Sequence, residues 1–314
     1  MTVIDAINLA LHECFLKDQR SIYFGEDVEA ALRGFSKGLM EKFGENRIRE
    51  CPISEAAFIG AATGAALKGM NVVVDLQISS LVYVGFDQIS NQALKLPFMM
   101  GSKIDIPVTY LIPCGSRRAL AGQHSDNPYG PLLNMGMDSY MVSNADNAYA
   151  ITHHCFYTKH PTAIFVPVHL FGAKSESFSP ETTGDFHPTR ISSGDCATLI
   201  TNGTTESYVR DSTLRNHLEG FFDHYNLTHL NTACLDQILS SVERTKKCAI
   251  VDDSYGESGF SNSLLGKIAS QSNGSVKFMS LNRTHHVVPF SRRLEEQVVV
   301  QDKRVDAFLK RLIL

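Results

Sequence analysis

One segment, residues 51–69, constrains the fold more than any other part of this sequence. Ser54 is a good N-cap, and apolar side chains then recur at helical spacing until Gly69 can close the helix. The pattern predicts a helix that begins at Glu55. An apolar run at 72–78 predicts a buried strand after it, and strand, loop, helix and strand in this order indicate a parallel sheet.

The predicted helix has a face with almost no side-chain bulk. Gly60 and Gly64 lie among alanines, so another backbone must approach closely, either at a subunit boundary or inside one core. Glu55 is the one carboxylate of this helix and lies in its first turn. It either complements the helix dipole or points into a cleft above the tightly packed interface.

The remainder of the chain repeats the alternation of strands and helices. Before residue 175 we expect helices at about 2–17, 34–44, 86–96 and 145–158, and strands at 21–24, 106–113, 140–142 and 163–168. After residue 195 we expect strands at 197–201, 228–231, 248–252 and 277–281, and helices at about 206–222, 236–245, 261–269 and from 302. The polar stretch 172–195 has turn formers and no periodicity. The sequence therefore predicts an α/β fold of two doubly wound domains, 1–175 and 196–314, with a linker at 176–195.

Composition excludes several classes of protein. The 314 residues suffice for two cores, and 43% hydrophobic with 20% charged residues is typical of a globular protein. A net charge of −4 gives no basic surface for nucleic acid or an anionic membrane, and no apolar run approaches a membrane span. The seven scattered cysteines include no C-x-x-C pair, and the N-terminus lacks a basic signal region. We expect a cytoplasmic protein.

Two further residues are candidates because ligands collect at the carboxyl ends of strands in open α/β sheets. Glu26 follows the strand at 21–24, and His124 lies in a glycine-rich polar loop after the strand at 106–113. A loop acid can be merely solvated, and a lone loop histidine can be without a role. The dinucleotide, Walker, zinc-protease and nucleophile-elbow motifs are missing from the sequence. We assign no metal ligand to this chain.

Several separated motifs in the first 130 residues resemble one family. They are Gly25-Glu26-Asp27-Val28, Gly38-Leu39, Arg47-Ile48, Pro52-Ile53-Ser54-Glu55, Asp87-Gln88-Ile89 and Gln123-His124-Ser125. Their order and spacing resemble the β subunit of thiamine-diphosphate-dependent 2-oxo acid dehydrogenases of the pyruvate and branched-chain type. The resemblance implies a transketolase-like pyrimidine-binding domain, followed by a smaller domain similar to the transketolase C-terminal domain.

The resemblance implies roles for single residues. The counterpart of Glu55 bonds N1′ of the cofactor's aminopyrimidine and so promotes loss of the thiazolium C2 proton. The counterpart of His124 donates or orients protons on the substrate or the acyl acceptor. Further pocket residues implied for the cofactor are Glu26, Ile53, Gln77 and Leu81.

The resemblance also implies partners. The Gly-Asp-Gly motif with a downstream Asn, which holds the diphosphate and Mg²⁺ in this family, is absent here. An α-type subunit would supply it, in an α2β2 heterotetramer. The small molecules implied are a 2-oxo acid and an acyl acceptor, with a lipoyl or carrier domain as another possible acceptor.

This chain departs from the family pattern at several positions. Aromatic residues are usual where Ser79 and Leu81 stand, and loss of stacking on the pyrimidine removes about 0.5–1.5 kcal/mol. Arg117 and Arg118 occupy a loop that is usually small and neutral. These two arginines could bind an anionic substrate, an acyl carrier or the acids of a partner subunit, or they could form a solvated basic turn. Gln123 and Ser125, which flank His124, are further candidates for contact with the substrate.

Three functions follow from this reading. The leading hypothesis is a β-like subunit that decarboxylates a 2-oxo acid and transfers the acyl unit, either to a small molecule, as a carboligase does, or to a lipoyl arm. The second is a regulatory or scaffolding homologue without turnover, against which Glu55 and His124 argue. The third, a split transketolase acting on sugar phosphates, is disfavoured by the motifs around Glu26 and His124.

Overall fold

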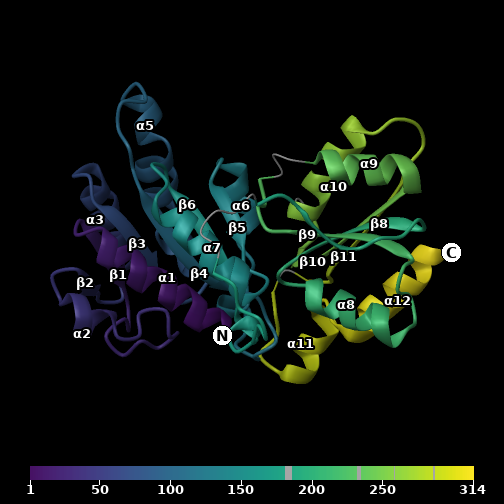
Figure 1. Ribbon diagram of the computed structural model, residues 1–314, viewed down its shortest axis with the longest axis horizontal. Coiled ribbons are helices and arrows are strands. Elements are labelled where there is room, and N and C mark those ends of the chain that lie inside the picture. Colours follow the sequence, from purple (N-terminus) through teal and green to yellow (C-terminus); the bar gives the residue numbers. More distant parts are fainter. Residues whose placement is uncertain (181–185, 232–234, 258, 286) are drawn as a thin grey trace. The chain divides into compact units, whose positions relative to one another are not determined.

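The computed structural model describes residues 1–180, 186–231, 235–257, 259–285 and 287–314. Its contacts divide the chain into two compact units, Met1–Cys114 with Pro131–Asp185 and Gly115–Gly130 with Phe186–Leu314. Each unit contains its own sheet with helices packed on it (Figure 1). Residues 115–130 thus group with the second unit, whereas the predicted first domain spans 1–175. The boundaries at 175 and 195 stay predictions.

The sheet of the first unit has six parallel strands in the order β2-β1-β3-β4-β6-β5. They are β1 (Ser21–Gly25), β2 (Ile48–Glu50), β3 (Asn71–Asp75), β4 (Val108–Cys114), β5 (Asp138–Met141) and β6 (Thr162–Pro167). Gly25 lies opposite Asp75 in the register of β1 and β3, so the segments after both strands leave from one edge. This arrangement confirms the predicted doubly wound fold.

In the first unit, α1, α3 and α7 begin where the sequence predicts, whereas the helix expected at 34–44 begins only at Leu39. The helices are α1 (Val3–Lys17), α2 (Leu39–Phe43), α3 (Glu55–Leu67), α4 (Leu81–Val84), the π-helix η1 (Gln88–Leu94), α5 (Leu96–Met99), α7 (Ala145–Phe156) and the 3₁₀ turn η3 (Val168–Leu170); the division of the chain into units falls within α6 (Tyr129–Asn134). Capping boxes at Thr2 and Asn144 start α1 and α7, which pack against each other. α3 begins at Glu55, but the side chain of Ser54 makes no capping hydrogen bond.

Two other predicted elements of the first unit are also wrong in extent. The strand expected at 72–78 ends at Asp75, because Gln77 has a left-handed backbone with φ +52° and donates its N–H to the Asp75 side chain. The helix expected at 86–96 is instead the seven-residue π-helix η1 between two single turns, α4 and α5. π-helical turns are frequent at functional sites.

The small-residue face of α3 is open at Gly64. Among the described residues, a Cβ built there would meet nothing within 4 Å, and one at Gly60 would meet only Gln88 Cγ, at 3.6 Å. Close packing inside the described part of this chain therefore does not account for Gly64, and a subunit boundary stays a prediction.

The second unit has a five-stranded sheet in the order β11-β10-β8-β9-β7. Its strands are β7 (Thr189–Ser192), β8 (Ala197–Asn202), β9 (Phe222–Leu227), β10 (Lys247–Tyr255) and β11 (Lys277–Arg283), and its helices are the 3₁₀ turn η2 (Gly122–His124), α8 (Glu206–Arg215), α9 (Asp236–Thr245), α10 (Phe260–Gln271), α11 (Arg292–Val298) and α12 (Asp302–Ile313). β7 pairs antiparallel with β9, and the other pairs are parallel. β7 lies within the stretch predicted as a linker.

Sequence reasoning misplaced three elements of the second unit. The strand expected at 228–231 is β9, whose buried polar side chains hide it from a hydrophobic pattern: Asp223 pairs with Arg190, and His224 shares a hydrogen bond with Thr201. The helix expected at 206–222 ends at Arg215, before the left-handed His217. α11 was not predicted.

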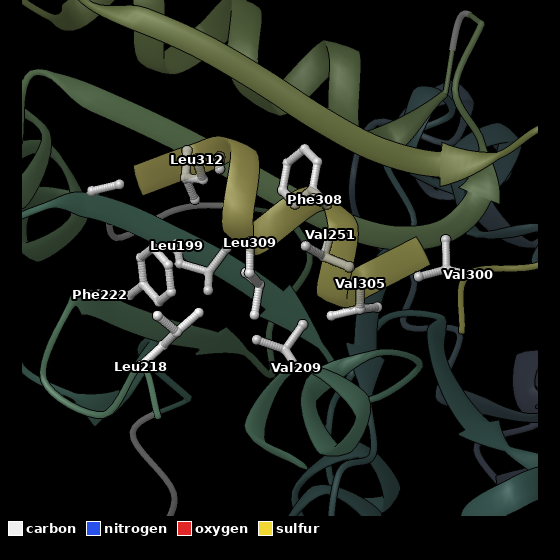
Figure 2. Packing of buried hydrophobic residues seen from close by; sticks show 12 residues of the cluster. Leu199, Val209, Leu218, Phe222, Val251, Val300, Val305, Phe308, Leu309 and Leu312 are labelled. Carbon is white, nitrogen blue, oxygen red and sulfur yellow. The ribbon is translucent and has the colours of Figure 1, made fainter. Parts of the chain in front are cut away.

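The last helix, α12, contributes several side chains to the hydrophobic core of the second unit. Val305, Phe308, Leu309 and Leu312 of α12 follow helical spacing and pack with side chains from β8, α8, β9 and β10 (Figure 2). Within the described ranges, no helix is both long and apolar enough to cross a membrane.

Candidate functional site

The first group of predicted site residues lies at the carboxyl ends of β1 and β3. Glu55 opens α3 and is 5% exposed, and Glu26 follows the last residue of β1. The structure brings these two acids close enough for the charge on Glu55 to raise the pKa of Glu26. A buried acid in the first helical turn is thus combined with a second acid from a neighbouring loop, as the sequence indicates.

Glu26 has a strongly altered acidity. Burial raises the pKa of its carboxyl to about 7, and the negative charges of Glu55, Asp27 and Glu50 act in the same direction, whereas a backbone hydrogen bond from Ser54 opposes them. Its Oε1 is buried without a hydrogen-bond partner in the described part of the chain. The Glu26 carboxyl can therefore hold or release a proton near neutral pH, beside Glu55.

Glu50 fixes the loop that carries Glu26. Its two carboxylate oxygens accept the backbone N–H groups of Asp27 and Glu29, each at 2.8 Å. Asp27 has a left-handed backbone with φ +51°, which an L-residue adopts rarely. The turn after β1 is thus held by hydrogen bonds from β2.

Gln77 is held rigidly at the end of β3. Its backbone N–H and side-chain Nε2 both donate to Asp75, each at 3.0 Å, and Tyr23 O–H donates to the same carboxylate at 2.8 Å. Arg33 Nε donates to the Gln77 carbonyl at 3.0 Å. Burial raises the pKa of Asp75 to about 6, although the bonds from Gln77 and Tyr23 oppose this. With its amide nitrogen fixed, Gln77 keeps its oxygen for another group.

Several buried polar atoms near these strand ends could accept hydrogen bonds from a ligand. At these strand ends and on η1, four buried oxygen atoms lack a hydrogen-bond partner among the described residues: Glu26 Oε1, Gln77 Oε1, Ser79 Oγ and Gln88 Oε1. Gln88 lies against α3, near Gly60. An unsatisfied buried acceptor costs about 1–3 kcal/mol, so a ligand that donates hydrogen bonds would recover that energy.

The two apolar residues predicted for this pocket differ in placement. Ile53 is 85% exposed, just before α3, and Leu81 is half-buried at the start of α4. Sequence reasoning did not single out Tyr23 or Gln88. Tyr23 lies inside a strand without a motif, and Gln88 entered only as part of Asp87-Gln88-Ile89.

The second group of predicted residues lies together in the loop 115–130 of the second unit. His124 ends the 3₁₀ turn η2 and is exposed, as are Gln123 and Arg118. Ser125 is 1% exposed, and its Oγ has no partner in the described ranges. The histidine is thus exposed in a loop of the second unit, whereas the sequence analysis placed it in the first domain, after the strand at 106–113.

Arg117 is committed to contacts within the second unit. Its guanidinium donates to the carbonyls of Val300 at 2.5 Å and Thr204 at 3.3 Å, lies 3.9 Å from Asp253, and stacks 4.0 Å from the ring centroid of Tyr208. These contacts fix the start of the loop. Of the two adjacent arginines, Arg118 is the exposed one.

Asp253 anchors this loop through contacts with Ser116 and Arg117. Sequence reasoning did not single it out. Burial opposes its ionisation, but Arg283 and Arg117 keep the pKa of its carboxyl below the ordinary value. Ser116 Oγ donates to it at 2.8 Å. Its place near the end of the buried strand β10 was a usable signal, because polar residues there share an edge with other strand ends.

Comparison with known proteins is consistent with this geometry. The family described as transketolase, pyrimidine binding domain, matches residues 1–172. Acetoin:2,6-dichlorophenolindophenol oxidoreductase subunit beta of Bacillus subtilis is 26% identical and covers 99% of this chain and 97% of its own length. The 3-methyl-2-oxobutanoate dehydrogenase subunit beta of Mycobacterium tuberculosis is 27% identical over 86% of this chain and 80% of its own.

Two further comparisons support the same conclusion. Pyruvate dehydrogenase E1 component subunit beta of Leifsonia xyli is 25% identical, covering 82% of this chain and 77% of its own. A solved structure titled "Split gene transketolase, inactive beta4 tetramer" superposes with a TM-score of 0.78 at 15% identity, over 100% of this chain and 98% of that one, and shows the fold alone.

The fold and the matched region define the class. The chain belongs to the transketolase pyrimidine-binding domain family, whose match covers more than half of its length. Within that family it is similar over most of its length to β subunits of a 3-methyl-2-oxobutanoate dehydrogenase and a pyruvate dehydrogenase, so the resemblance noted in the sequence is confirmed.

Proposed function

We propose that this chain is the β-type subunit of a two-component thiamine-diphosphate enzyme that decarboxylates a 2-oxo acid and transfers the acyl unit to an acceptor. The observation that carries the proposal is the pair Glu26 and Glu55, with unsatisfied acceptors after β1, after β3 and on η1. When bound, thiamine diphosphate supplies the electron sink that such a decarboxylation needs.

Glu55 would hold a proton against the aminopyrimidine ring. Its buried place at the start of α3 keeps water away from that hydrogen bond. Glu26, whose pKa is raised to about 7, would take up or release a proton beside this ring. Gln77 Oε1 would accept a hydrogen bond from the ring's amino group. Leu81 would pack on the ring, with Ile53 at the rim.

His124 would donate or orient protons on the substrate or the acyl acceptor, with Gln123 and Ser125 beside it. Arg118 is the arginine we propose for an anionic substrate or carrier, because it is the exposed one of the two adjacent arginines. The acceptor is a small molecule or a lipoyl or carrier domain.

An α-type subunit would supply the rest of the machinery. It would bind the diphosphate and Mg²⁺, for which this sequence lacks the family motif, and pair with this chain in an α2β2 heterotetramer. The name "subunit beta" of the relatives supports a multisubunit assembly.

The substitution Glu55→Gln in the assembled complex tests the proposal. It should slow exchange of the cofactor's C2 proton by about 100-fold or more, because a positioned acid–base group contributes at least this much, while assembly is retained. Exchange is followed by NMR in deuterated buffer, and Glu41→Gln, an exposed acid on α2, is the matched control.

The same experiment separates the two leading functions. If Glu55→Gln exchanges the proton as fast as the wild type, the role of Glu55 is wrong. If the wild-type complex itself exchanges no proton, the chain is instead the regulatory or scaffolding homologue.

A further inference from the structure

The loop 115–130 contains unfavourable backbone conformations that contacts with other segments must stabilise. Arg117, Ala119 and Ala121 all have positive φ, of +80°, +54° and +65°, which L-residues adopt rarely. Each such residue costs about 1–2 kcal/mol relative to ordinary backbone. The loop keeps this shape only because other contacts overdetermine it.

Glu295 of α11 provides support at the strained residues themselves. Its side chain is buried, with the residue 1% exposed. Oε1 accepts the backbone N–H of Arg117 at 2.7 Å, and Oε2 accepts that of Ala119 at 2.9 Å. Hydrogen bonds to a carboxylate are about twice as strong as neutral ones, and alternating backbone amides form a concave site for an anion.

The other anchors hold the two ends of the loop. The Gly115 N–H donates to the Asp126 carbonyl at 2.9 Å and closes the base, and Asn127 Nδ2 donates to the Asp253 carbonyl at 2.6 Å. Tyr129 O–H donates to Asp252. Residues 117–119, which lead directly to His124, are held at their backbone by Glu295.

The path from Glu295 to His124 is short. Ala121 is two residues beyond Ala119, and its carbonyl accepts the N–H of His124 at 3.2 Å, which forms the turn η2. A shift of the backbone at 117–119 would therefore move the imidazole. Gly122 allows little alternative packing, since a Cβ there would lie 3.0 Å from Val287 Cγ1.

We propose that Glu295 is a positioning residue, whose carboxylate fixes the backbone of residues 117–119 and thereby sets the place of the His124 side chain. The inference rests on the proposed function only where it assigns proton transfer to His124. The C-terminal part of the chain then contributes to the reaction through this helix without touching substrate.

Hydrogen–deuterium exchange of the full chain tests the anchor without cofactor or partner. Glu295→Ala should raise exchange of the amides at 117–121 at least tenfold, while amides of β8 and β10 stay protected. Glu295→Gln, which keeps one acceptor oxygen, should give an intermediate increase. Glu296→Gln changes the next, exposed acid of α11 and should behave as the wild type.

Two results would overturn the anchor. One is wild-type exchange at 117–121 in Glu295→Ala with the fold intact. If Glu295→Ala instead loses protection throughout the second unit, exchange in Glu295→Gln decides the test. Unchanged exchange at 117–121 in Glu295→Gln then overturns the proposal.

Kinetics of the assembled enzyme test the positioning. Glu295→Gln should lower kcat of acyl transfer at least tenfold, while C2-proton exchange, which depends on Glu55, stays within twofold of the wild type. A merely structural role of Glu295 would lower kcat and the rate of C2-proton exchange by the same factor. Equal losses in these two rates would therefore contradict the proposal. Failure of the proposed function looks different, because the wild type would then show no C2-proton exchange at all.

Discussion

At the scale of single residues, the acidity of Glu26 is the most informative property. Its pKa of about 7 is far above the ordinary value of 4.5, because the carboxyl is partly buried among the charges of Glu55, Asp27 and Glu50. Between these two pH values the folded chain binds more protons than the unfolded chain. Below pH 4.5 the Glu26 carboxyl therefore does not destabilise the folded state. Its destabilising effect grows with pH until the pH passes about 7.

We expect Glu26→Gln to stabilise the first unit at high pH. The carboxyl is partly solvated, which reduces the gain to about 1 kcal/mol, or a rise in Tm of about 2–4 °C at pH 8.5. Near pH 4 the variant and the wild type should unfold at the same temperature. Calorimetry across this range checks the prediction, with the exposed Glu45→Gln as the control. A constant difference at all pH values would show that Glu26 is not the titrating group.

At the scale of elements, α3 is packed tightly on one side and open on another. A Cβ added to Gly85 would lie 2.2 Å from Cδ1 of the fully buried Ile59 of α3. A Cβ added to Gly64 would meet no atom of the described ranges within 4 Å. The two glycines therefore serve different purposes: Gly85 lets a neighbouring segment approach α3, and Gly64 keeps a surface of the helix flat.

Alanine substitutions should separate these two purposes. Gly85→Ala should lower the free energy of unfolding by about 1–3 kcal/mol, because the added methyl overpacks the contact with Ile59. Gly64→Ala should raise it by about 0.5–1 kcal/mol, because alanine restricts the unfolded chain and favours helix. Urea denaturation of the isolated chain measures both. Destabilisation by Gly64→Ala would contradict the open face.

At the scale of the whole molecule, the candidate residues fall into two groups. The acids Glu26 and Glu55 belong to the first unit, and His124 belongs to the second, where β10 and α11 hold its loop. The sequence contains no motif for the diphosphate and Mg²⁺. Under the proposed function, a second polypeptide is needed to retain the cofactor.

We expect the isolated chain to bind thiamine diphosphate weakly. Calorimetry with Mg²⁺ should detect at least 100-fold tighter binding once a subunit that carries the Gly-Asp-Gly motif is added, because most of the cofactor's charge would be bound there. A partner with its motif aspartate changed to alanine is the control and should restore weak binding. Tight binding by the isolated chain would contradict the division of the site between subunits.

The sequence by itself determined the α/β class, the start of α3 at Glu55 and the position of Glu26 after β1. These features follow from short-range rules, because helical spacing and apolar runs extend over a few residues. Such rules failed at β9, where buried polar residues are paired with side chains elsewhere in the chain. They also failed at Gln77, where Asp75 ends the strand.

Only the tertiary structure decided which distant groups meet. It placed the charge of Glu55 beside Glu26, left the side-chain oxygen of Gln77 buried without a partner in the part of the chain that is described, and joined Glu295 to Arg117 across 178 positions of sequence. No local periodicity encodes contacts of this kind, because they depend on how strands and helices pack after they form. The acidity of Glu26 and the support of the His124 loop are therefore properties of the folded chain.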